Sequence, residues 1–418
     1  AKPHMSYKEM VEQLVTASGA TNDNGAVNYI LAHLGGPNPA GRAGQDGAFD
    51  VVPITARTVR LFLGYQIQCT QCHDHPFNAD WKQKHFWGVN TFFRQVERVG
   101  NPGMNQNQQM QMQGAPLRLR DNTGYNTKGI VFYEKRNGVF LPSEPVFLDG
   151  RRIPAGGQLT RREELARFIT SHKNFGGAYV NRMWGHLFGR GLNVKPQADD
   201  FGEHNEVVHP ELLAKLSEQF ERTGSYDPRK LLKWICSSDP YNLKAVANPT
   251  NIVPEAEPYF ARMGIKMMSP EQLLESLITA TKPAGAEDGV VRDAQRNLRA
   301  QWMNVLVRNF GDDEGNEATY NGTILQALLM MNGRDLNNAI STNGSGTVKK
   351  AMDLGARDPK LTVDYLFKAT VSRPANPKEY QQIIGVINKI GLRDQANAGP
   401  LQDLFWALLN SNEFVLNH

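Results

Sequence analysis

Start and stop signals for helices recur along the second half of this chain, and they constrain its fold more than any other sequence feature. Thr160 and Glu163 form a capping box ahead of an apolar stripe that carries Leu165, Phe168 and Ile169. Apolar residues follow at helical spacing after four prolines that suit a first helical turn: Pro210, Pro228, Pro270 and Pro377. The sequence therefore predicts a mainly α, multi-helix fold from residue 160 onward.

The pattern before residue 160 is mixed. Ile130 to Tyr133 and Val146 to Leu148 are short apolar runs, separated by the turn-forming pair Asn137-Gly138 and by prolines. These features predict a small β ribbon near residues 130–150.

The segments that flank residue 70 carry helical signals. Residues 59–67 fit both a helical face and near-alternation, and we favour a helix. Asp80 is predicted to cap a helix with an aromatic stripe through residues 81–96. Such a stripe suits the wall of a cofactor site, but stripes at helical spacing more often belong to a core.

The composition is that of an ordinary globular chain. It has 418 residues, of which 40% are hydrophobic and 21% charged, and this length is sufficient for two or three domains. The net charge of +4 is small and dispersed, so we expect no nucleic-acid partner. Because no run of about 18 apolar residues occurs, we expect no membrane span. Three cysteines cannot make a disulfide framework.

One string, Cys69-Thr70-Gln71-Cys72-His73, carries the strongest chemical signal. Two thiols separated by two residues can form thioether bonds to a porphyrin, and the histidine that follows becomes an axial iron ligand. With this number of cysteines and histidines, chance produces the pattern in about one such sequence in two thousand. The motif predicts one covalent haem c per chain, attached through Cys69 and Cys72, with His73 as the proximal ligand.

Other uses of the two thiols remain open. A thioredoxin-like redox pair prefers a strand-to-helix junction. A structural zinc site needs a second ligand pair, whereas Cys236 stands alone at an apolar helix end and is predicted to be a small buried hydrophobe. A local disulfide or an inert thiol pair is the third alternative.

Two sets of motifs follow one another along nearly the whole chain. The first comprises Phe62-Leu63-Gly64, residues 68–77 and Phe92-Phe93. The second comprises Arg162 with Leu165-Ala166, residues 181–192, residues 199–201, residues 209–213 and the last residues, 406–418. Together they resemble the planctomycete cytochrome-c-like domain family, followed by the planctomycete domain of unknown function that commonly accompanies it.

The resemblance implies a division of the chain and a lineage more than an activity. It implies a cytochrome-c-like domain over residues 1–128, a strand-rich connector over residues 129–158 and a helical domain of unknown function over residues 159–418. The first domain is shorter at its amino terminus than the family pattern, so we do not expect Ala1 to begin the gene product. Residues 104–113 look like an insertion.

The second axial position decides what a haem here would do. A methionine or histidine makes an electron carrier, whereas an open position permits ligand binding or peroxide chemistry. His186 and His209 are the leading candidates for a distal ligand because both lie in family-like motifs. Their structural alternatives are a core side chain and a helix cap. Weaker candidates are three methionines: Met104, Met110 and Met112. His75 is expected to lie too close along the chain.

Two further sites can be drawn from the same motifs. A nitrogen and oxygen metal site that activates water could be formed by His73, Asp74, His75, Asp199, Asp200 and His209. The structural alternative for the two aspartates is a helix cap or an ion pair with Arg182 or Arg190. The arginines and tryptophan of residues 181–192 could also bind an acidic or sugar ligand.

The expectation is an extracytoplasmic c-type haem protein that carries electrons through one haem. The location, the periplasm or cell envelope, follows because bacteria complete covalent haem attachment outside the cytoplasm. We expect a redox partner protein, and a homo-oligomer or larger assembly is an option. The alternatives are a non-redox structural or interaction module of the cell envelope, or a metal-dependent hydrolase linked to polysaccharide breakdown.

Overall fold

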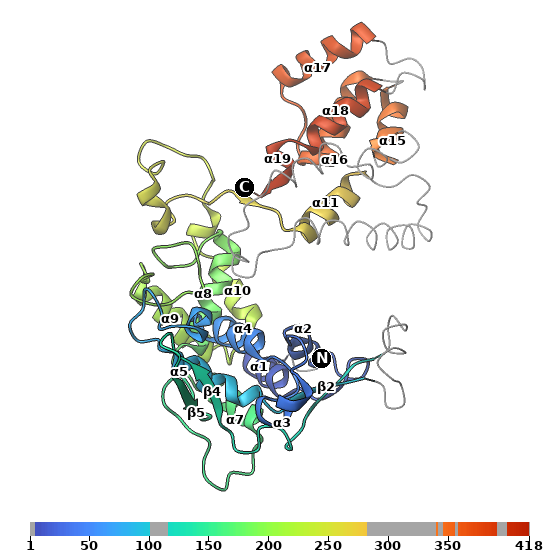
Figure 1. The fold of residues 1–418 in the computed structure, drawn as a ribbon. Coiled ribbons are helices and arrows are strands. Elements are labelled where there is room, and N and C mark those ends of the chain that lie inside the picture. The colour runs from blue at the N-terminus through green and yellow to red at the C-terminus, as the bar shows by residue number, and fades with distance from the viewer. Residues whose placement is uncertain are drawn as a thin grey trace. The chain divides into compact units, whose positions relative to one another are not determined.

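The computed structural model describes residues 5–100, 116–281, 340–341, 346–355, 358–390 and 399–417 (Figure 1). The chain divides into two compact units. The amino-terminal unit comprises residues 1–242 and 253–260, and the carboxyl-terminal unit comprises residues 243–252 and 261–418. Helices predominate in both units, and the strands form small antiparallel sheets. The predicted mainly α fold with a small β ribbon is therefore confirmed.

The described residues of the amino-terminal unit form short helices and two small sheets. Its helices are α1 (Tyr7–Thr16), α2 (Val27–Ala32), α3 (Ala43–Asp46), α4 (Val52–Leu63), α5 (Gln83–Asn90), α7 (Arg161–Thr170), α8 (Phe175–Phe188), α9 (Pro210–Glu221) and α10 (Pro228–Cys236). One antiparallel sheet has the order β1 (Gly19–Ala20), β3 (Arg118–Asp121), β2 (Val96–Val99). The other is a hairpin of β4 (Val131–Glu134) and β5 (Phe140–Ser143).

Reciprocal capping fixes where α1 and α7 begin. The Ser6 side chain accepts the Glu9 N–H, and the Glu9 carboxylate accepts the Ser6 N–H. Thr160 and Glu163 form the same capping box at α7, as predicted. Each box satisfies N–H groups that have no partner inside the helix.

Arg162 ties segments that lie far apart in the sequence. Its guanidinium is 2% exposed and donates to Asp121 on β3 and to the carbonyls of Val15 and Ala17 at the end of α1. Residues on both sides of the predicted connector, 129–158, therefore lie in one compact unit. The predicted domain boundaries were drawn from the resemblance to the two families, not from compactness, so they stay a prediction.

The helix favoured over residues 59–67 is present as far as Leu63. α4 ends there because Gly64 adopts a φ of +69°, a left-handed conformation that glycine takes at no steric cost. A Cβ at Gly64 would lie 2.7 Å from the Phe201 ring, and the Phe201 N–H donates to the Gly64 carbonyl over 2.8 Å. The close approach of Phe201 thus also favours the end of α4 at Gly64.

Asp80 does not cap the helix that follows it, so that prediction was wrong. α5 begins at Gln83, and the Gln83 N–H donates to the Asp74 carboxylate over 3.2 Å. The Asp80 N–H instead donates to the Asn78 side chain over 3.1 Å, in a local turn. A carboxylate further back along the chain therefore takes the place at the positive end of α5.

The second strand of the β ribbon lies earlier than predicted. The Lys135 N–H donates to the Val139 carbonyl over 2.9 Å, and Gly138 supplies a φ of +76°. This tight turn starts the pairing at Phe140. Val146, which was predicted to begin the strand, forms only an isolated bridge with Arg152.

In the part that the structure describes, the carboxyl-terminal unit is a helical bundle with one short strand pair. Its described helices are α11 (Pro270–Thr281), α15 (Gly346–Gly355), α16 (Pro359–Val371), α17 (Pro377–Ile390), α18 (Gly399–Leu409) and α19 (Asn412–Val415), and β6 (Lys266–Met267) pairs with β7 (Leu416–Asn417). Its core includes Leu274, Val348, Leu366, Phe405 and Leu409. Within the part of the chain that the structure describes, no helix is long and apolar enough to cross a bilayer.

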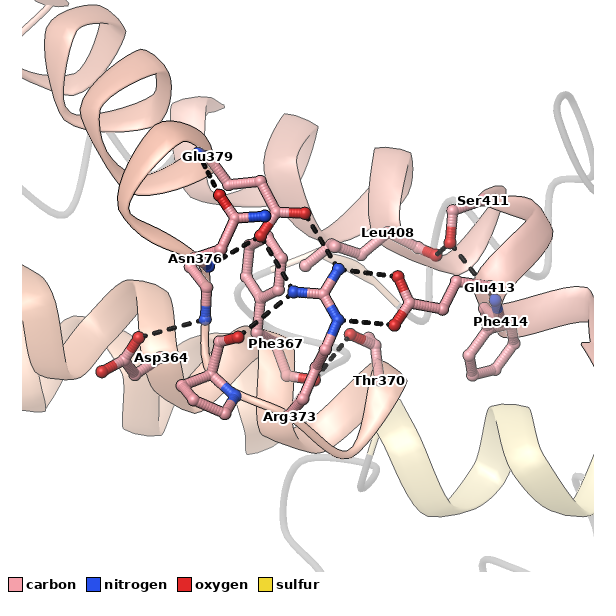
Figure 2. Close-up of polar contacts among 12 residues, drawn as sticks. Asp364, Phe367, Thr370, Arg373, Asn376, Glu379, Leu408, Ser411, Glu413 and Phe414 are labelled. Carbon is pink, nitrogen blue, oxygen red and sulfur yellow. Dashed lines mark hydrogen bonds and ion pairs between the residues drawn. The ribbon is translucent and has the colours of Figure 1, made fainter. Parts of the chain in front are cut away.

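Arg373 joins three helices of this bundle (Figure 2). It lies after α16 and donates two hydrogen bonds to Glu413 on α19, of 2.6 and 2.7 Å, and two to Glu379 on α17, both of 2.9 Å. These bonds from Arg373 lower the pKa of Glu379 to about 2. All of the contacts lie within one chain unit, so this cluster serves the fold.

Candidate functional site

The string from Cys69 to His73 folds into one short helical turn. It begins in the 3₁₀ turn η2 (Gln68–Gln71), and the N–H groups of Cys72 and His73 both point at the Cys69 carbonyl, over 3.3 and 3.4 Å. Residues three positions apart on such a turn lie on the same face. Cys69 and Cys72 therefore share one side, with His73 next along the chain, and both cysteines are exposed free thiols.

The His73 ring is held by a backbone contact. Its Nδ1 lies 2.7 Å from the Asp74 carbonyl oxygen. A carbonyl can only accept, so Nδ1 must donate, and the lone pair belongs to Nε2. Histidines that bind metals usually have their other nitrogen fixed in this way. His73 is thus in the tautomer that an Nε2 iron ligand requires.

The turn is supported from beneath by α5. The Gln71 carbonyl accepts hydrogen bonds from the Trp87 indole over 3.0 Å and from the Gln83 amide over 3.4 Å. Thr70 is fully buried and donates to the Ile67 carbonyl over 2.6 Å. The reactive side chains are exposed, whereas the backbone that carries them is anchored.

A second histidine, which the sequence interpretation did not single out, lies beside this turn. The rings of His75 and His204 are 5.4 Å apart, and His204 Nε2 lies 2.9 Å from the Asp200 carboxylate. Partial burial, and then the neighbouring His204, lower the pKa of His75. Asp200 belongs to the Asp199-Asp200-Phe201 motif, and His204 follows it four residues later. That spacing is the only sequence signal for the contact between Asp200 and His204.

His204 lacks a free nitrogen that faces the motif. Nε2 is held by Asp200, and Nδ1 is buried with no hydrogen-bond partner. A Cβ at Gly202 would lie 2.8 Å from Nδ1, so backbone closes off that side of the ring. His204 therefore packs against His75 and supports the loop that follows the turn.

Both histidines predicted as distal ligands are among the described residues, and His209 already has contacts of its own. His209 Nε2 is 3.0 Å from the Pro258 carbonyl, and its ring packs against Tyr259 and Phe260. His186 is exposed on α8. The three candidate methionines, Met104, Met110 and Met112, fall outside the described residues. Ring contacts to His75 come from Phe77 and His204. His186 and His209 stay predictions as iron ligands.

The two aspartates proposed for a hydrolytic metal site are already paired. Asp199 lies 2.8 Å from Arg182 and 3.1 Å from Arg60, and these side chains are 9 to 13% exposed. Asp200 holds His204. Across the described ranges, no group of three or more histidine, cysteine, aspartate or glutamate side chains is arranged to hold a metal ion.

The 181–192 motif has structural roles in this fold. Asn181 is fully buried; it donates to the Asn193 side chain and the Ala198 carbonyl and accepts the Leu192 N–H, all within 2.7 Å. Gly189 ends α8 with a φ of +81°. The motif therefore shapes the loop that places residues 199–201 against α4.

Together these observations define a class: a helical protein of two compact units with a cysteine-rich turn at the surface of the first. Residues 2–98, which include the turn, match the family PSCyt2, a protein of unknown function (DUF1549). Residues 161–320 match PSD1, a protein of unknown function (DUF1553). The two domains of this planctomycete-associated pair occur in the predicted order. No curated protein and no solved structure matches the chain.

Proposed function

We propose that this chain is an extracytoplasmic c-type haem protein that carries electrons through one haem. The observation that supports it best is the placement of Cys69, Cys72 and His73 on a single turn that closes on the Cys69 carbonyl. The donor set fits the group, because both thiols are exposed and His73 keeps Nε2 for iron. When bound, haem supplies a one-electron redox centre.

The chain's own residues would attach and orient the group. Cys69 and Cys72 would supply the sulfurs of the two thioether bonds, and the Asp74 carbonyl holds the His73 ring. Trp87 and Gln83 fix the turn through the Gln71 carbonyl. Because the attachment points are exposed, the group would be accessible to a partner protein. A single centre per chain then needs such a partner, or an ordered assembly, to move electrons further.

The distal ligand decides between electron transfer and ligand binding. In this fold His209 would have to use Nδ1, since Nε2 contacts the Pro258 carbonyl. Carbon monoxide tests the position: a six-coordinate electron carrier should show little change in its reduced spectrum. His186→Ala and His209→Ala variants that become able to bind carbon monoxide would identify the ligand.

The proposal is tested by producing the chain in a bacterial host that attaches haem outside the cytoplasm. We expect a reduced-minus-oxidised spectrum typical of haem c and an intact mass raised by one haem. Replacing both Cys69 and Cys72 by serine should abolish the covalent attachment. His73→Ala should keep the added mass but lose the low-spin spectrum.

A matched control is available in the third cysteine. Cys236→Ser removes a thiol outside the turn and should leave both spectrum and mass unchanged. A colourless wild-type chain of unmodified mass would contradict the proposal and favour a non-redox envelope module. Bound zinc or iron without porphyrin would favour the hydrolase alternative.

A further inference from the structure

The β4–β5 hairpin presents an apolar face to solvent. Val131 and Tyr133 are buried, so the alternation of a strand turns Phe132 and Glu134 outward. Phe132 pairs with Pro142, and Glu134 pairs with Phe140. Phe132 is 51% exposed and Phe140 is 62% exposed. Two large aromatic side chains thus lie on the outer face of a two-stranded sheet, where polar residues are usual.

The hairpin is attached to the same support as the cysteine turn. The Tyr133 ring stacks on Trp87 with the planes 4° apart, and Trp87 donates to Gln71 within the turn. The Gln83 amide donates to the carbonyls of both Gln71 and Glu134. One side chain therefore connects the hairpin backbone to the turn backbone, and Figure 1 shows β4 and β5 beside α5.

Basic residues flank the two phenylalanines. Lys135 and Arg136 form the exposed tip of the hairpin, and neither makes an ion pair within the described part of the chain. Nearby Glu144 is neutralised by Arg152. On the outer face itself, Glu134 is the single acidic residue of the two strands. An apolar centre with unpaired positive charge at its edge complements an acidic protein surface with an apolar centre.

We propose that this outer face, Phe132 and Phe140 with Lys135 and Arg136, is the docking surface for an acidic redox partner protein. The inference rests on the proposed haem function, because the turn that would hold the haem lies next to the hairpin. Aromatic side chains would supply the contact area, and the basic tip would raise the association rate.

The test uses a small acidic plant-type [2Fe–2S] ferredoxin as the electron donor to the haem-loaded protein. Stopped-flow spectroscopy gives the second-order rate of haem reduction at low and high salt. We expect the rate to fall as salt rises, because salt screens the steering charges. The K135E/R136E variant should lower the low-salt rate about tenfold and flatten the salt dependence. The F132S/F140S variant should lower the rate at both salt concentrations.

Two matched controls have the same chemistry at other exposed positions. K195E/K215E makes the same change in net charge, and L159S/V194S removes two exposed apolar side chains. Both controls should stay within twofold of the wild-type rate. Dithionite, which needs no docking surface, should reduce every variant equally. Hairpin variants that react as fast as the controls would overturn the docking surface.

Binding of the same ferredoxin, measured by biolayer interferometry with haem-free protein, separates this inference from the haem proposal. A chain without haem whose ferredoxin binding is lost in K135E/R136E would sink the proposed function but keep the acidic partner surface. A haem-loaded chain whose binding is unaffected by either hairpin variant would do the reverse. F132S/F140S could instead dissociate an oligomer in analytical ultracentrifugation and leave ferredoxin binding intact. In that case the face joins two copies of the chain and the proposal fails.

Discussion

The cysteine turn and the loop after α8 are both rich in polar and reactive residues, but they differ in what those residues bond to. In and around the loop, Asn181 of α8 and Asp199 are buried and direct their polar atoms at their own chain. In the turn, the backbone is anchored while Cys69 and Cys72 are exposed thiols. The contrast distinguishes a motif that shapes the fold from one that is free to take a ligand.

Asn181→Ala should be the most destabilising change. It removes three hydrogen bonds in a fully buried site and leaves the Leu192 N–H and the Ala198 carbonyl without that partner. We expect a loss of about 3–5 kcal/mol in the free energy of unfolding. Urea titration of the amino-terminal unit measures it. Asn242→Ala, at an exposed site, should cost under about 1 kcal/mol. Equal costs for the two variants would show that the loop does not hold the fold.

His172 predicts a pH dependence for the stability of the amino-terminal unit. It is 8% exposed beside Tyr65, and burial lowers its pKa to about 4 from 6.5. The unfolded chain therefore binds more protons between these values. This stability is complete above pH 6.5 and is lost as the pH falls toward 4, by up to about 3 kcal/mol.

Urea titrations at pH 7 and pH 4.5 should show this loss in the wild-type chain and a smaller one in His172→Phe. The phenylalanine keeps the ring contacts with Tyr65 and Phe147 but cannot take up a proton. The same pH dependence in both chains would place its origin in other groups.

Trp87→Phe tests whether the turn is anchored as the structure indicates. The variant keeps an aromatic ring against Tyr133 but removes the donor to the Gln71 carbonyl. We expect a cost of about 1–2 kcal/mol and faster amide exchange at residues 69–73. Hydrogen exchange read by mass spectrometry checks it. Unchanged exchange there, with the cost spread over the unit, would contradict the anchoring role.

Arg373→Lys should have the smallest effect. The arginine pairs bidentately with Glu413 and Glu379, but its side chain is 35% exposed. The Asn181 side chain, in contrast, is fully buried. Lysine keeps the charge and loses the planar pairing, so we expect about 1 kcal/mol in the carboxyl-terminal unit. Thermal unfolding measures it. A loss of stability equal to that of Asn181→Ala would show that burial does not determine how much these hydrogen-bond networks contribute.

Local signals in the sequence predicted the elements that local chemistry controls. The Thr160 capping box and the Pro377 helix start are present, because a cap needs only residues three or four positions apart. The predicted Asp80 cap is absent because the Asp74 carboxylate accepts the hydrogen bond from the first N–H of α5 instead. The strand predicted at Val146 is absent because the tight turn at Gly138 makes β4 pair with residues 140–143 instead.

The site could be predicted only where it is local. Cys69, Cys72 and His73 lie on one turn, which a motif of contiguous residues can specify. His204 meets His75 only through folding, so no spacing in the sequence connects them. A distal ligand for the proposed haem would depend on tertiary structure in the same way, and the sequence alone leaves His186 and His209 as the leading candidates.

We propose that Cys69 and Cys72 carry haem, and the intact mass of the chain measures this attachment. Protein from a host that attaches haem outside the cytoplasm should, after denaturation in acid, keep one added haem mass and resist alkylation at Cys69 and Cys72. An unmodified mass, with both thiols open to iodoacetamide or joined to each other, would show that the turn carries no haem.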